Sequence, residues 1–240
     1  MSAGTESTGG EQGPLRALGL LVEALAAVRA GPLAAAALAS HLPSLVWMVL
    51  KRAEPAGKEP FPADMRTAAI GLLLAIPVVA AHAAIILGTL ERMGGRSSPL
   101  GDLLGRALSR LLPALGGAFA VIAAVGLGLV LFVVPSLVLA CMLFAALPAV
   151  VVEGGGVLPA LARSAWLTQG SRWAILRLLA ILGCAQVGAV LGLEALRGDG
   201  PPGDAYLLGS WLLQALFTIL TAASSALVYA RLRLAREGRR

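Results

Sequence analysis

Two histidines and a row of polar side chains stand inside long apolar segments, where they could do chemistry. His41 and His82 occupy the first two such segments, and imidazole can hydrogen-bond, bind a metal ion or relay a proton. A further polar series shares one helical face: Gln214, Thr218, Thr221 and Ser225. Neither histidine has a carboxylate or cysteine at ligand spacing. Hydrogen bonds between neighbouring helices are therefore the favoured role, and a path for a solute is the alternative.

A second candidate set follows an apolar segment and comprises Glu153, Arg163, Ser164 and Trp166. An unpaired glutamate beside a hydroxyl could act as a general base, although a glutamate in this position more often caps a helix or pairs with an arginine. The sequence lacks HExxH, GxSxG and P-loop motifs and paired intramembrane aspartates. It therefore predicts a protein that is not an enzyme.

The two cysteines, Cys141 and Cys184, both lie within apolar runs. A structural zinc site needs four clustered ligands, and a disulfide scaffold needs more cysteine than this. We expect both thiols to be reduced and inert, and the sequence predicts no metal site and no cofactor.

The composition requires a bilayer around most of the chain. Of 240 residues, 58% are hydrophobic and only 13% are charged, with a mean hydropathy of +0.85, whereas soluble domains carry about a quarter charged residues. Since about 20 apolar residues cross a bilayer, the hydropathy pattern predicts six transmembrane helices. They cover about 33–50, 67–90, 112–133, 136–152, 173–193 and 206–230, and a break at Val134–Pro135–Ser136 divides the longest uncharged run.

Three short segments with arginine on one face and leucine, valine or tryptophan on the other precede the pairs of spans. They cover 14–29, 98–110 and 157–168, and such amphipathic helices lie on a membrane surface. We expect an all-α, polytopic membrane helical bundle with these three interfacial helices on the cytoplasmic side. Its single domain, 14–232, comprises the units 14–90, 98–152 and 157–230, between a disordered tail, 1–13, and a basic tail, 233–240.

The basic residues indicate the orientation. With the termini on the inside, fourteen Lys and Arg residues fall on the inner side and five on the outer side. The positive-inside rule then places both termini in the cytoplasm. The net charge is +6, and the basic residues that produce it flank the apolar segments. We therefore expect anionic lipid headgroups as partners at the cytoplasmic face, and no nucleic acid.

The segment from about 95 to 175 resembles a known family. Its pattern is Pro135, then Glu153 after an apolar span, followed by Ala160, Ser164, Leu167, Gly170 and Trp173. This is similar to the membrane domain at the front of some bacterial glycerophosphodiester phosphodiesterases and to the YciC-like membrane proteins. Ser136 replaces the usual glycine after the proline. The resemblance implies a bacterial inner membrane as the location. It also implies lipid association or anchoring without hydrolase activity, because the catalytic barrel of the fused enzymes is a separate domain.

Three hypotheses follow. The favoured one is a non-catalytic accessory, scaffold or lipid-associated protein. Its working surface would surround Glu153, Arg163, Ser164 and Trp166, with lipids and a membrane or cytoplasmic protein as partners. The second is a small-solute transporter or channel that uses the polar faces of the first, second and sixth spans, including His41 and His82. The third is an interfacial enzyme that uses Glu153.

Overall fold

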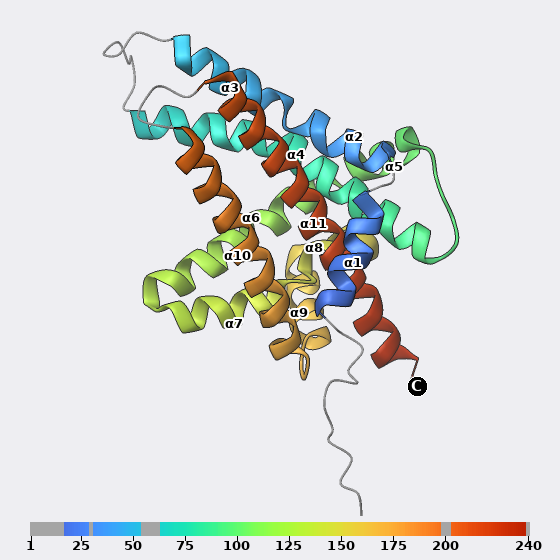
Figure 1. Ribbon diagram of the computed structural model, residues 1–240. Helices are drawn as coiled ribbons and strands as arrows, with labels where there is room; N and C mark the ends of the chain where they lie inside the picture. Colours follow the sequence, from blue (N-terminus) through green and yellow to red (C-terminus); the bar gives the residue numbers. More distant parts are fainter. Residues whose placement is uncertain (1–16, 29–30, 54–62, 198–202, 239–240) are drawn as a thin grey trace, which may run out of the picture.

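The computed structural model describes residues 17–28, 31–53, 63–197 and 203–238, and within these ranges it is helical without strands (Figure 1). The helices are α1 Ala17–Val28, α2 Gly31–Ser40, α3 Leu42–Ala53, α4 Ala63–Met93, α5 Leu100–Ser109, α6 Leu111–Leu131, α7 Val133–Leu143, α8 Ala146–Glu153, α9 Val157–Leu167, α10 Arg172–Arg197 and α11 Asp204–Glu237. The predicted tail 1–13 lies outside the described residues. The all-α prediction is confirmed.

Six segments of these helices are long and apolar enough to cross a membrane. They are Gly31–Leu50, Ala69–Met93, Leu111–Leu131, Val133–Glu153, Arg172–Arg197 and Asp204–Glu237. Each coincides with one of the six predicted spans, since about 20 apolar residues in a helix match the hydrocarbon thickness. The chain is a multi-pass membrane protein.

Two of the six spans are broken near their middle. The helix of the first is interrupted at His41, between α2 and α3, and that of the fourth at Phe144–Ala145, between α7 and α8. Pro43 enters the first turn of α3, where a missing backbone N–H removes no helical hydrogen bond. Pro77, by contrast, lies inside the continuous helix α4.

The hairpin between α6 and α7 turns at Phe132, three residues before the predicted proline. Pro135 therefore falls in the first turn of α7, where it is tolerated. Ser136 Oγ donates to the carbonyl of Val125 at 3.0 Å. A Cβ on Gly128 would lie 2.9 Å from Ser136 Cα, so glycine permits the close approach of the two helices.

Helix α11 runs through the centre of the bundle (Figure 1) and packs against α1, α2, α3, α4, α8, α9 and α10. Its residues 222–229, mostly Ala and Ser, are all buried. Small side chains let helices approach closely where the bilayer supplies no hydrophobic drive. In contrast, α6 and the hairpin turn present large apolar side chains outward, with Val130 84% and Phe132 77% exposed, as a lipid-facing surface requires.

The short helices α1, α5 and α9 form where the three amphipathic segments are predicted. They lie at the end of the bundle that contains the C-terminal end of α11 (Figure 1). In α9, Ala160, Ser164 and Leu167 are buried, whereas Leu158 is 77% exposed. We call this the basic end, because the described arginines Arg92, Arg96, Arg106, Arg110, Arg163, Arg172, Arg177, Arg231, Arg233 and Arg236 belong to the helix ends that meet there.

Candidate functional site

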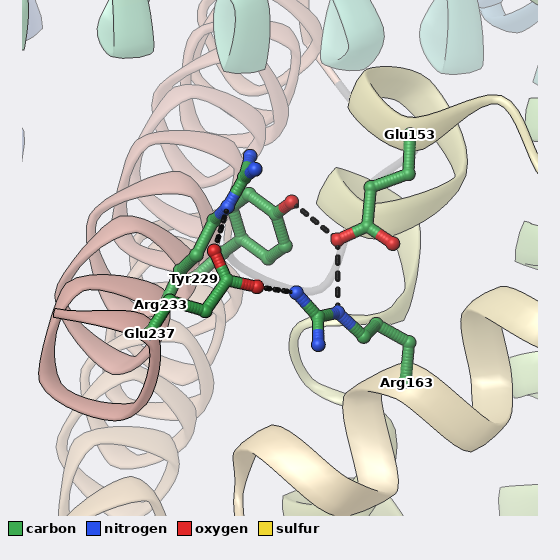
Figure 2. Close-up of polar contacts among 5 residues, drawn as sticks. All are labelled: Glu153, Arg163, Tyr229, Arg233 and Glu237. Carbon is green, nitrogen blue, oxygen red and sulfur yellow. Dashed lines mark hydrogen bonds and ion pairs between the residues drawn. The ribbon is translucent and has the colours of Figure 1, made fainter. Parts of the chain in front are cut away.

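The carboxylate of Glu153 joins three helices at the basic end. Its Oε1 accepts a hydrogen bond from the Tyr229 hydroxyl at 2.7 Å and another from Arg163 Nε at 3.0 Å (Figure 2). Glu153 closes α8, Arg163 belongs to α9 and Tyr229 to α11. The Tyr229 side chain is only 1% exposed, so this polar contact reaches into the packed core.

Arg163 extends the contact toward the end of α11. Its second nitrogen donates to Glu237, whose other oxygen accepts from Arg233 Nε at 2.8 Å (Figure 2). Tyr229, Arg233 and Glu237 follow one another at intervals of four residues and so share one helical face. Burial acts to lower the pKa of Arg163, but hydrogen bonds to Glu237 and Glu153 outweigh it and raise the pKa. We call these five residues the polar cluster: Glu153, Arg163, Tyr229, Arg233 and Glu237.

Glycines let the chain reverse between α8 and α9. Gly154 adopts φ 66° and Gly156 φ 90°, a region that glycine enters without steric cost. A Cβ on Gly154 would overlap the guanidinium of Arg110. The reversal packs α9 back against α8, which brings Arg163 to Glu153.

Ser164 anchors α9 from the inside. It is fully buried, and its hydroxyl donates to the carbonyl of Met142 at 2.7 Å. Thr168 Oγ1 lies 3.3 Å from the same carbonyl. The sequence placed Ser164 on the cytoplasmic surface. In the structure its side chain instead lies in the interface between α9 and α7.

Trp166 lies beside two guanidinium groups. Arg163 is 5.0 Å and Arg236 4.8 Å from the centre of its indole ring, within the range of cation–π attraction. Arg236 also donates to the carbonyl of Gln169. The arrangement combines an aromatic ring and two positive charges in partly exposed surroundings.

Positive charge exceeds negative charge at the basic end. Its ten arginines face five described carboxylates, namely Glu23, Glu91, Asp102, Glu153 and Glu237. Ion pairs join Glu23 to Arg231, Glu91 to Arg106, and Glu153 and Glu237 to Arg163. Among the described residues, these ion pairs and the one between Arg233 and Glu237 do not include Arg110 or Arg236.

The intramembrane candidates have separate surroundings. His41 Nε2 and Thr218 Oγ1 form a hydrogen bond of 2.9 Å between the first and sixth spans, while His41 Nδ1 is buried without a partner. His82 instead lines a cavity of about 340 Å³. Gln214 lines another, of about 210 Å³, together with Gln186. The structure thus brings His41 and Thr218 together and places the other two elsewhere.

Sequence reasoning missed three members of the polar cluster, Tyr229, Arg233 and Glu237. The first part of the basic tail predicted over 233–240 belongs to α11, which continues to Glu237. The pair Arg233–Glu237 at i, i+4 and the contact with Arg163 stabilise this extension. The spacing of four residues between Tyr229, Arg233 and Glu237 could have indicated that they share one helical face.

No group of three or more His, Cys, Asp or Glu side chains in the described ranges could hold a metal ion. The chain matches no family model, and no curated protein or solved structure matches it significantly. The resemblance of residues 95–175 to the phosphodiesterase membrane domain therefore stays a prediction.

Proposed function

We propose that this chain is a non-catalytic inner-membrane protein whose basic end lies in the cytoplasm and associates with anionic lipid headgroups. The excess of arginine at one end of six candidate spans supports both parts, because cytoplasmic ends of membrane proteins carry excess Lys and Arg. Basic surface residues also attract the anionic lipids of the cytoplasmic leaflet. The resemblance to a membrane domain that accompanies phosphodiesterases favours the same accessory role.

The observation that carries the proposal is the group formed by Trp166, Arg163 and Arg236. A tryptophan ring prefers the headgroup region because most of the ring is apolar and its N–H is polar. Arg236 keeps N–H donors that can bind a phosphate with two hydrogen bonds. Exposed apolar side chains lie at the same end, among them Leu158 at 77% and Trp173 at 78%, and these fit the acyl chains below a headgroup.

The polar cluster supports a role without catalysis. Oε1 of Glu153 already accepts hydrogen bonds from both Tyr229 and Arg163, so this oxygen is engaged as a structural acceptor. A general base needs a lone pair directed at a substrate proton. A Glu153→Gln protein should fold and complement a deletion of the gene, and a folded variant that fails to complement would favour an interfacial enzyme.

The proposal is tested by native mass spectrometry of the protein released from nanodiscs. The nanodiscs contain equal parts phosphatidylglycerol and phosphatidylcholine with identical acyl chains. We expect phosphatidylglycerol to be enriched among the retained lipids, and Arg236→Gln to reduce that enrichment by about fivefold, the effect of one charge-assisted contact of about 1 kcal/mol. The matched control is Arg197→Gln at the opposite end of the bundle, which should leave the enrichment unchanged.

Equal retention of both lipids by the unaltered protein would contradict the proposal. So would an identical loss in the Arg236→Gln and Arg197→Gln proteins, since that would indicate a general effect of charge. A protein partner retained in stoichiometric amount from native membranes, with no lipid enrichment, would favour a scaffold over a lipid-associated module.

A small-solute transporter is the second candidate, and the polar series of α11 favours it. Gln214 lines one cavity, and Thr221 and Ser225 line the other, so two separate cavities adjoin the same helix. Flux of polar solutes into liposomes that contain the protein tests this candidate. Flux that falls when Gln214→Leu is introduced would favour a transporter, whereas liposomes as tight as empty ones would exclude it for the solutes used.

A further inference from the structure

A cavity of about 340 Å³ lies among α4, α6, α7, α8, α10 and α11. Its volume is within the range of small-molecule sites in proteins. Most of its lining is apolar, with Ile122, Phe144 and Leu179 as examples, and the polar lining consists of His82, Thr221 and Ser225. The lining residues include no charged side chain. None of these residues belongs to the polar cluster, so the cavity is independent of the proposed lipid-headgroup site.

The cavity lies near the middle of the bilayer. His82 is next to the centre of the candidate span Ala69–Met93, Ile122 next to that of Leu111–Leu131, and Leu143 at that of Val133–Glu153. The hydrocarbon core is about 30 Å thick, so this depth is about 15 Å from either headgroup layer. A phospholipid headgroup is therefore too far away, and the occupant must be soluble in the hydrocarbon.

One wall of the cavity carries all its hydrogen-bonding groups. His82 belongs to α4, and Thr221 and Ser225 to α11, two helices that pack closely together. The hydroxyl of Thr221 donates to the carbonyl of Phe217 at 2.7 Å, and that of Ser225 to the carbonyl of Ala222 at 2.9 Å. Since their hydrogens are used in this way, both oxygens offer lone pairs to the cavity as acceptors.

His82 supplies the complementary group. No hydrogen bond from its ring to any other residue is recorded in the described part of the chain, and a neutral imidazole has one N–H donor and one acceptor nitrogen. A polar group in hydrocarbon is stabilised when it finds a partner. A ligand that both donates to Thr221 or Ser225 and accepts from His82 would satisfy this wall, and a hydroxyl group does both.

The cavity has access to the membrane interior along α6. Ile122, which lines it, is 71% exposed on the outer surface of the bundle. A molecule dissolved among the acyl chains can thus enter sideways without crossing the headgroup layer. A charged ligand would pay a large desolvation cost at this depth without a charged partner in the lining.

We propose that this cavity binds a neutral lipid alcohol: a molecule with a long apolar body and one hydroxyl group at the level of the bilayer midplane. The hydroxyl lies against His82, Thr221 and Ser225, and the apolar body contacts the side chains of α6, α7 and α10. The site distinguishes its ligand from other membrane components by one hydroxyl rather than by charge.

The proposal is tested by photolabelling of the whole protein in nanodiscs. The probe is a long-chain primary alcohol with a diazirine in its chain, and the comparison probe is its methyl ether, which can accept but not donate a hydrogen bond. We expect the alcohol to label residues of the cavity about fivefold to tenfold more than the ether at equal concentration, the effect of one hydrogen bond in apolar surroundings.

Three variants locate the site. Thr221→Val combined with Ser225→Ala should reduce labelling by the alcohol to the level of the ether. His82→Phe removes the donor that serves both probes, so it should reduce labelling by both and leave the preference for the alcohol in place. Ala118→Leu fills the cavity from α6 without removing a polar group and should reduce labelling by both probes. Gln214→Leu, which changes the same helix α11 at the other cavity, is the matched control and should label as the unaltered protein does. Thermal unfolding in the same nanodiscs identifies any variant that is misfolded.

Equal labelling by alcohol and ether, or labelling outside the cavity, would overturn the proposal. Preference for a ketone probe of the same length would also overturn it, because a ketone can accept from His82 but cannot donate to α11. Folded protein with Thr221→Val and Ser225→Ala that still prefers the alcohol would show that the hydroxyl is recognised elsewhere.

Discussion

Helix α11 has a tyrosine near each of its two ends, and each tyrosine lies beside glutamate and arginine side chains, but the two groups differ in what they connect. The far-end group comprises Glu194, Arg197 and Tyr206. There the Tyr206 hydroxyl donates to Glu194, and Arg197 lies 3.4 Å from Glu194 and 5.5 Å from the Tyr206 ring. These contacts join α10 to α11, the next helix along the chain.

The polar cluster at the basic end joins elements that are distant in sequence. Tyr229 is 76 residues from Glu153, and Glu237 is 74 residues from Arg163. Tyr229 is also 1% exposed, whereas Tyr206 is partly exposed. Exposed ion pairs contribute little to stability, whereas buried hydrogen bonds to charged groups contribute more. The same three residue types are thus a local surface contact at one end and a connection among α8, α9 and α11 at the other.

The largest expected difference between the two ends comes from removing each tyrosine side chain. Tyr229→Ala should lower the free energy of unfolding by about 3 to 5 kcal/mol, as for other large aromatic side chains in a core. Tyr206→Ala should cost less than about 1 kcal/mol, because its surroundings are partly open. Unfolding in mixed detergent micelles, followed by circular dichroism, measures both. Equal losses would remove the distinction between the two ends.

A smaller difference is expected when only the hydroxyl groups are removed. Tyr229→Phe should cost about 1.5 kcal/mol, since a buried hydrogen bond to a carboxylate is lost, and Tyr206→Phe about 0.5 kcal/mol. The same unfolding measurement applies. If Tyr229→Phe unfolds like the unaltered protein, the stabilising role of Tyr229 lies in packing alone.

The smallest difference concerns the arginines. Arg163→Gln should cost about 1 kcal/mol and Arg197→Gln about 0.3 kcal/mol, because both guanidinium groups have solvent-exposed parts. The cost of Arg163→Gln should also fall as salt is added, since screening weakens the charge attraction in the unaltered protein. A salt-independent cost would attribute the effect to packing of Arg163 on Trp166 instead.

The sequence was most informative where a property depends on local composition. The six spans follow from the length of apolar runs, and α1, α5 and α9 follow from the spacing of leucine and arginine. The closeness of Glu153 and Arg163 could also be predicted from the sequence, because they are only ten residues apart. Hydropathy, however, carries no information on which face of one span meets which face of another, and the partnership of Tyr229 with Glu153 depends on that packing.

The histidines illustrate the same limit. His41 and His82 both lie near the middle of their spans, and the sequence favoured a hydrogen bond to a neighbouring helix for each without naming the partner. The rotation of each helix decides instead that His41 meets Thr218 and that His82 faces a cavity. The same limit applies to the end of α11, because the sequence does not reveal that Glu237 meets Arg163 of α9.

The most direct test of the contrast between the two ends is amide hydrogen exchange in nanodiscs, comparing Arg163→Gln with Arg197→Gln. Exchange reports local opening, so a connection among distant elements should loosen all of them together. We predict that Arg163→Gln speeds exchange in α8, α9 and the C-terminal turns of α11, whereas Arg197→Gln affects only the adjoining ends of α10 and α11. Faster exchange confined to α9 in the Arg163→Gln protein would contradict the role of the polar cluster as a connection among three helices.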